Sequence, residues 1–250
     1  MLAFLISPDI DLSSAIILVG TSAATSFLSA ATGIGGGMVL LAVMASFVPA
    51  AIIIPVHGLV QIGSNAGRMF LMVKHVQWSI LMPFLFGSTL GAATGGITSI
   101  QLSPQVLEVG LAIFILWMVW GTPITASGRF AIFGTGIFSS FLTMFFGATG
   151  VFISAMIKTL NLGRLEHVAT HSTFMLAQHL IKVSVFGILG FSFAPYVGLI
   201  AAMVISGFLG TILGKRFLLK INDKFFHLCL SILLSLLAMR LLFRSIFFYF

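Results

Sequence analysis

Long runs of apolar residues without a formal charge recur along almost the whole chain. Examples are residues 12–67, 79–101, 109–128, 130–157 and 183–214. Most are about as long as one crossing of a bilayer core of roughly 30 Å, and the first is long enough for two or three. Because no water is available inside a bilayer, each segment must satisfy its own backbone groups, so we expect helices.

Proline, glycine and charge breaks divide these runs into ten expected helical segments, five in each half. The segments are residues 10–31, 35–47, 50–73, 78–98 and 103–120, followed by 129–146, 149–160, 165–189, 194–218 and 223–248. If all ten cross and the acidic N-terminal end lies outside, nine of the twelve lysines and arginines fall at cytoplasmic ends, as the positive-inside rule favours. The second segment of each half spans only about 20 Å. We expect it to be a broken or half-helix, giving 8–10 membrane segments in all.

The two halves carry the same pattern. Ser-Phe-Leu-Ser-x-x-Thr-Gly-x-Gly-Gly from Ser26 recurs 114 residues later as Ser-Phe-Leu-Thr-x-x-Phe-Gly-x-Thr-Gly from Ser140, and the same shift carries His57 onto His171. Repeated halves in an apolar chain are typical of transporters built by duplication, and an odd number of crossings per half inverts the second half. We therefore predict an all-α integral membrane protein with one transmembrane domain, residues 1–250, and inverted structural repeats at residues 10–121 and 129–248.

Two ladders of small residues occupy corresponding helices of the two halves. They are Gly87, Gly91 and Gly95 in the first half, and Ser206, Gly210 and Gly214 in the second. Small residues at four-residue spacing let helix backbones approach closely. We expect these ladders to pack helices rather than to bind a ligand.

The composition excludes several classes of protein. Charged residues make up 7% and apolar residues 59% of the chain, and the mean hydropathy is +1.20, whereas soluble domains carry roughly 25% charged residues. The formal charge of +7 comes from cations that are not clustered, so we expect no nucleic-acid partner. The single cysteine, Cys229, allows neither an internal disulfide nor a multi-cysteine metal site. We expect a multi-pass protein of the cytoplasmic (inner) membrane of the cell, with the lipid bilayer as its environment.

Two glycine-rich elbows are candidates for the site. Gly33-Ile34-Gly35-Gly36-Gly37 precedes a short apolar helix, and Gly147-Ala148-Thr149-Gly150 occupies the corresponding place in the second half. Glycines let a ligand approach the backbone, and the free amides at a helix N-terminus attract an oxyanion. The first elbow lacks the Gly-Lys-Ser/Thr ending of a nucleotide-binding loop. Close helix packing is the alternative reason for these glycines.

Gly35-Gly36-Gly37 leading a short apolar helix, with a degenerate copy half a chain later, resembles the TauE/SafE family of sulfite and organosulfonate permeases. The resemblance runs from about Ala15 to Leu241. It implies secondary transport of small sulfur-containing or carboxylated anions without ATP. Val151 stands where the first copy has Gly37, a departure from the expected run of glycines.

Polar side chains gather on the third segment of each half, where their burial would be costly without a partner or a cavity. The expected substrate-binding residues are Gly33, Gly35, Gly36, Gly37, His57, Ser64, Asn65, Gly147, Thr149, Gly150, His171 and Gln178. A neutral histidine can donate to an anion, or it can instead bond a neighbouring helix. Arg68 and Lys182 are expected towards opposite mouths of the path, where they attract anions, contribute to gating or extend to lipid headgroups.

The leading hypothesis is a secondary transporter that carries a small anion by alternating access. An anion channel is the nearest alternative. An intramembrane enzyme is not expected, because His167 and His171 lack the glutamate of a His-Glu-x-x-His motif and no Gly-x-Ser-x-Gly motif occurs. We expect no cofactor and no metal; histidine titration near neutral pH would allow proton coupling. A homodimer is left open.

Overall fold

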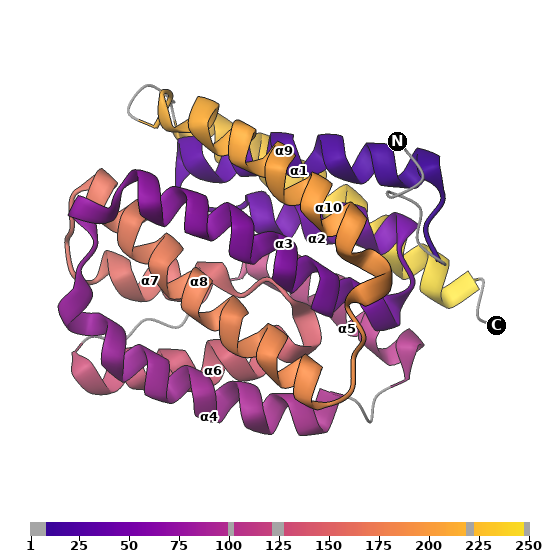
Figure 1. Cartoon of the computed structure of the whole chain (residues 1–250), viewed down its shortest axis with the longest axis horizontal. Coiled ribbons are helices and arrows are strands. Elements are labelled where there is room, and N and C mark those ends of the chain that lie inside the picture. The colour runs from indigo at the N-terminus through magenta and orange to yellow at the C-terminus, as the bar shows by residue number, and fades with distance from the viewer. Residues whose placement is uncertain (1–8, 100–102, 122–127, 219–222, 248–250) are drawn as a thin grey trace.

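The structure is a computed structural model that describes residues 9–99, 103–121, 128–218 and 223–247 (Figure 1). All ten expected helices are present in this part of the chain, which contains no strand. They are α1 (Leu12–Thr32), α2 (Gly36–Phe47), α3 (Ala50–Leu71), α4 (Leu81–Ser99), α5 (Pro104–Trp120), α6 (Arg129–Phe146), α7 (Gly150–Lys158), α8 (Arg164–Ile188), α9 (Val197–Lys215) and α10 (Asp223–Phe247). Three short 3-10 turns connect these helices. η2 (Val73–His75) follows α3, η3 (Trp78–Ile80) precedes α4, and η4 (Ala194–Tyr196) precedes α9. The prediction of an all-α protein is confirmed.

Five long apolar stretches and two short helices stand out among these elements. Five stretches are long and apolar enough to cross a membrane: Leu12–Thr32, Ala50–Leu71, Trp78–Ser99, Arg129–Phe146 and Ala194–Lys215. By contrast, α2 has 12 residues and α7 has nine, which at 1.5 Å per residue reach only about 18 Å and 14 Å. These are the two short helices that the sequence predicted after the elbows.

The first helix begins at a side-chain cap. The Asp11 carboxylate accepts a hydrogen bond of 2.6 Å from the backbone N–H of Ser14. This bond and those from the Ser14 and Ser13 hydroxyls lower the pKa of the Asp11 carboxyl, because they favour its charged form. The start of α1 and the end of α10 lie at the same end of the molecule (Figure 1).

Two tightly packed helix pairs flank the centre of the molecule. In Figure 1, α4 lies along α6 at one edge and α9 lies along α1 at the other. A Cβ atom at Gly91 would lie 2.1 Å from the carbonyl oxygen of Ile137, and one at Gly210 would lie 2.1 Å from that of Ala23. Only glycine fits at such distances, so the small-residue ladders pack helices as expected.

Helices α3 and α8 lie between these pairs and contact each other. With the shift of the expected repeat, α1 corresponds to α6, α3 to α8 and α4 to α9. The contact of α4 with α6 then corresponds to that of α9 with α1, and the contact of α3 with α8 corresponds to itself. The two halves thus make matching contacts, while their inversion across the bilayer stays a prediction.

Candidate functional site

The two elbows break the chain between α1 and α2 and between α6 and α7. Gly33 and Gly35 have φ angles of 93° and 99°, and Gly147 has 72°, values that favour glycine. Thr149, at the position of Gly35, has an ordinary φ of −108°. No side chain caps α2 or α7, and the third amide of each helix, that of Met38 or Phe152, bonds a backbone carbonyl. The first two amides and the positive dipole end of each helix therefore have no side-chain cap.

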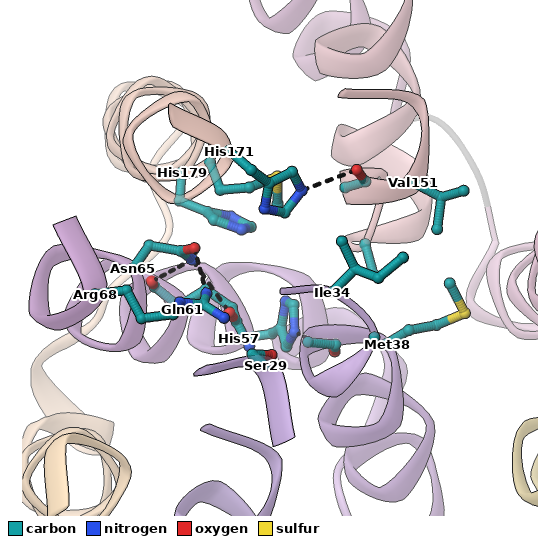
Figure 2. A pocket seen from close by; sticks show the side chains of 15 residues that line it. Ser29, Ile34, Met38, His57, Gln61, Asn65, Arg68, Val151, His171 and His179 are labelled. Atoms are coloured by element: carbon teal, nitrogen blue, oxygen red, sulfur yellow. Dashed lines mark hydrogen bonds between the residues drawn. The ribbon is translucent and has the colours of Figure 1, made fainter. Parts of the chain in front are cut away.

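A cavity of about 40 Å³ lies between the elbows (Figure 2). Its walls come from the end of α1, both elbows and helices α2, α3, α7 and α8. They consist of Ser29, Ile34, Gly35, Gly37, Met38, His57, Gln61, Asn65, Arg68, Ala148, Gly150, Val151, His171, Met175 and His179. Such a volume holds a few water molecules or a small ion and is far below the roughly 300–1,000 Å³ of sites for drug-sized ligands.

The lining residues are related by the repeat. Ten of the fifteen form five pairs that are 114 positions apart in the sequence: Ile34 and Ala148, Gly37 and Val151, His57 and His171, Gln61 and Met175, and Asn65 and His179. Each half therefore contributes five equivalent positions to the wall. The cavity lies where the two halves meet.

On the α3 side, three polar residues form a connected group. The Asn65 side-chain amide donates to the Gln61 carbonyl at 2.7 Å and to the Gln61 side-chain oxygen at 3.2 Å, while Asn65 Oδ1 accepts a hydrogen bond from the Arg68 guanidinium. The Arg68 Nε atom is buried without a protein partner. These bonds hold the guanidinium at the wall of the cavity.

His57 and His171 each contact the helix that follows an elbow. His57 Nε2 lies 2.9 Å from the Gly37 carbonyl oxygen, and His171 Nε2 lies 2.9 Å from that of Gly150. Because a carbonyl only accepts, both Nε2 atoms carry the hydrogen, and Nδ1 of the neutral ring is an acceptor. In this structure each Nε2–H is thus directed to a backbone carbonyl, which is the alternative to donation to an anion. The two histidines brace α2 and α7 and also line the cavity.

His179 is the histidine with free bonding capacity. Its side chain is 0% exposed and lines the cavity, and its ring lies edge-on to that of His57 with the centroids 5.9 Å apart. Neither of its ring nitrogens has a partner within the protein. Figure 2 shows His179 on α8 facing Asn65 on α3 across the space.

The buried side-chain atoms without a protein partner concentrate at this cavity. In the part of the chain that the structure describes, they are His57 Nδ1, Arg68 Nε, His171 Nδ1, both ring nitrogens of His179, Ser88 Oγ and Thr211 Oγ1. All but the last two belong to lining residues. Buried polar groups normally have partners, so these nitrogens are free to bond water or a ligand in the cavity.

The sequence identified about half of the wall. Of the predicted site residues, Gly35, Gly37, His57, Asn65, Arg68, Gly150 and His171 line the cavity. Gly33, Gly36, Ser64, Gly147, Thr149, Gln178 and Lys182 are not among the lining residues. His179, Gln61 and Ser29 are lining residues that the prediction omitted. The repeat itself could have identified His179, since it stands 114 residues after Asn65.

The residues away from the cavity have other contacts. A Cβ atom at Gly36 would lie 1.9 Å from the Thr25 carbonyl oxygen, so this glycine allows α2 to pack on α1. Ser64 accepts a hydrogen bond of 3.0 Å from Ser26. The Gln178 amide donates to Ser140 at 3.0 Å and also to Ser139. For these positions, helix packing accounts for the residue type.

Arg68 and Lys182 do not reach lipid headgroups. The Arg68 side chain is 3% exposed and that of Lys182 is 0% exposed, whereas a cation that extends to the headgroups keeps its charged end at the surface. The expectation of peripheral cations is therefore wrong. Both lie in the interior, Arg68 at the cavity wall and Lys182 beside the second elbow.

The three lining histidines do not form a metal site. Among the described residues, no group of three or more histidine, cysteine, aspartate or glutamate side chains is arranged to hold a metal ion.

Comparison with known proteins adds the family. Neither a curated protein nor a solved structure matches the chain. The family described as "Sulfite exporter TauE/SafE" matches residues 16–241, almost the whole chain and nearly the range over which the motifs suggested a resemblance. The chain therefore belongs to the TauE/SafE family of membrane transporters and is a multi-pass membrane protein.

Proposed function

We propose that the protein is a secondary transporter that carries a small oxyanion, with sulfite as the leading candidate, across the cytoplasmic membrane by alternating access. The observation that carries this proposal is the group of unpartnered buried nitrogens around one small cavity between two uncapped helix N-termini. Family membership supports an anion as the substrate.

The charges of the cavity favour an anion. Arg68 is the charged residue of the wall, and no carboxylate occurs among the lining residues. The dipole ends of α2 and α7 add positive potential. An anion bound here would receive hydrogen bonds from the Arg68 guanidinium, the first-turn amides and the His179 ring.

The size of the cavity favours a compact anion. Its volume of about 40 Å³ corresponds to roughly three water molecules, if one water needs about 10–15 Å³. Sulfite, with a sulfur and three oxygens, is of this size, whereas an organosulfonate also carries a carbon chain. Among the substrates that the family suggests, the small oxyanion therefore fits this conformation best.

The position of the cavity is suited to alternating access. It lies between two halves that each contribute five equivalent positions to its wall, and each half carries one elbow at a helix break. Rocking of one half against the other would expose the cavity to each side in turn. The equivalent bonds within each half, His57 to Gly37 and His171 to Gly150, would keep the binding groups in place during that movement.

Counterflow in proteoliposomes tests this proposal. We expect saturable uptake of radiolabelled sulfite that is accelerated by unlabelled sulfite inside the vesicles, because a carrier exchanges its substrate. Protein-free liposomes give the background. Ohmic current without counterflow would indicate a channel, and the absence of any sulfite flux would reject sulfite as the substrate.

A further inference from the structure

Lys182 is an ionisable side chain buried beside the cavity. It is 0% exposed, and its Nζ atom donates to the carbonyl oxygen of Gly147 in the second elbow at 3.3 Å. Its Cε atom lies 2.9 Å from the place where a Cβ atom of Gly58 would be. The absence of a side chain at Gly58 therefore makes room for the lysine between α8 and α3.

No carboxylate on the neighbouring helices balances this lysine. The elements packed most closely against α8 are α3, α4, α6, α7 and η2, while α1, which α8 also contacts through Arg164, carries no charged or titratable group. Their titratable and charged groups are His57 and Arg68 on α3, Arg129 on α6, Lys158 on α7, and Lys74 and His75 on η2, with none on α4. The acid of α8 itself, Glu166, is sixteen residues away, about 24 Å along the helix.

Two other acidic residues, Asp9 and Glu108, have hydrogen-bond partners away from Lys182. Asp9 accepts a hydrogen bond from Tyr196 at 2.7 Å, and Glu108 accepts one from Ser245 at 2.8 Å. An ammonium group has three donors, whereas the bond to Gly147 gives Lys182 one carbonyl acceptor. A buried cation with so few partners is costly, and a negative charge in the cavity would reduce that cost.

We propose that Lys182 carries a coupling proton, so that each anion moves together with one proton. This inference rests on the proposed transport function. Anion binding stabilises the Lys182 ammonium, and the proton comes from the aqueous side to which the cavity is then open. After the halves have rocked, the anion leaves, Lys182 returns to the neutral amine, and the proton is released on the other side. The net event is the transfer of one proton and one anion in the same direction.

His179 provides the connection between Lys182 and the cavity. It stands one helical turn before Lys182, lines the cavity, and has no protein partner at either ring nitrogen. Lys182 lies close enough to act electrostatically on both His179 and His57. A neutral imidazole accepts a proton at one nitrogen and releases one from the other. His179 is therefore placed to pass the proton between the cavity and Lys182.

Proton-driven accumulation in proteoliposomes tests the role of Lys182. Radiolabelled sulfite uptake and the signal of a trapped pH-sensitive dye are measured together, with an imposed pH gradient as the driving force. Lys182→Arg keeps a permanent charge and Lys182→Gln removes it, so neither can bind and release a proton. We expect at least a tenfold loss of proton-driven accumulation in both variants, and a smaller loss of sulfite counterflow, which needs no net proton movement.

The controls separate the two proposals. Because sulfite itself binds protons, variants are compared at one pH rather than one variant across a pH range. Lys158→Gln removes an exposed lysine at the end of α7 and should leave both readouts unchanged. If the wild type shows no sulfite flux, the transport proposal fails. If wild-type protein transports sulfite and either Lys182 variant still accumulates it in response to a pH gradient, the coupling role of Lys182 is wrong.

A binding measurement on purified protein tests the proposal for variants that insert poorly into vesicles. Calorimetric titration of purified protein with sulfite in two buffers of different ionisation enthalpy gives the number of protons taken up on binding. We expect Lys182→Arg to take up about one proton fewer per bound anion than the wild type does. An unchanged number would contradict the proposal.

Discussion

The α3 and α8 walls of the cavity occupy equivalent positions but use their polar groups differently. On α3, Asn65 and Arg68 bond each other and face the cavity. At the equivalent positions of α8, His179 faces the cavity without a partner, while Lys182 bonds the second elbow instead. In the proposed mechanism, the first half therefore supplies a fixed cation for binding, and the second supplies groups that gain and lose a proton. Equivalent positions of the two halves would then have different roles.

The contacts that hold α3 and α8 show the same divergence. Ser26 on α1 donates to Ser64 on α3, and the equivalent pair in the second half is Ser140 on α6 and Gln178 on α8, also joined by a hydrogen bond. The longer Gln178 side chain additionally accepts a hydrogen bond of 3.2 Å from Thr149. The second elbow is thereby tied to its neighbouring helix, whereas Gly35 at the first elbow has no side chain to tie.

The largest expected effect on sulfite affinity comes from replacing Arg68 or Lys182 by glutamine, one at a time. Arg68→Gln should weaken sulfite binding by about a hundredfold, roughly 2.7 kcal/mol, because a buried charge-assisted contact is lost. Lys182→Gln should weaken it only about tenfold at the same pH, since Lys182 is not among the lining residues. Calorimetric titration measures both affinities. Arg68→Lys retains the charge without the planar fork and should give an intermediate loss.

Equal losses for the two glutamine variants would break this comparison. They would mean that both cations contact the anion directly, so that the two halves contribute equally to binding. Arg129→Gln, which changes an exposed cation at the start of α6, is the matched control and should bind sulfite with unchanged affinity.

The helices could be predicted from the sequence because lipid and backbone bonding leave few alternatives for long apolar segments. Every expected segment is a helix, and the 12 residues of α2 follow directly from the glycine break and the apolar run. The packing role of Gly91 and Gly210 was also predictable, because regular spacing of small residues has one common cause. In these cases the local pattern alone determines the structure.

The site was harder to predict because it depends on which helix face meets which neighbour. Gly36 and Gly37 are adjacent and chemically identical, yet Gly36 packs on α1 and Gly37 lines the cavity. Arg68 and Lys182 look like peripheral cations in a linear sequence, and only the packing of α3 against α8 shows that both are interior. The orientation of each helix about its own axis is a tertiary property.

A second prediction compares the first residue of α2 with that of α7. Gly36→Ala should lower the free energy of unfolding by about 1–3 kcal/mol through overpacking, because the new Cβ would meet the rigid Thr25 backbone at 1.9 Å. Gly150→Ala should cost clearly less, since the nearest atoms, His171 Nε2 at 3.2 Å and Met175 Sδ at 3.3 Å, are side-chain atoms that need to shift by only a few tenths of an ångström. Thermal unfolding in detergent measures the difference.

Gly134→Ala is the control for this pair, because a Cβ atom at Gly134 meets nothing within 4 Å. It should stabilise α6 slightly, by up to about 1 kcal/mol. If Gly150→Ala destabilised the protein as much as Gly36→Ala, the two short helices would be equally constrained and the second elbow would not be the more adaptable one.

The smallest expected effect concerns the width of the cavity at the second elbow. Val151 lines the cavity at the position of Gly37 in the first half. Val151→Gly should therefore enlarge the cavity, and we expect sulfite affinity to change by only about threefold, roughly 0.7 kcal/mol. The gain should appear with longer anions, as stronger inhibition of sulfite uptake by methanesulfonate. Val151→Ala removes less volume and avoids the lower helix propensity of glycine, so it should show the same trend more weakly.

The reverse change, Gly37→Val, would place its Cβ atom 3.2–3.3 Å from the Gln61 side-chain amide and should weaken sulfite binding instead. Unchanged selectivity in Val151→Gly would show that the second elbow does not limit substrate size, and the difference between the halves would then concern charge alone.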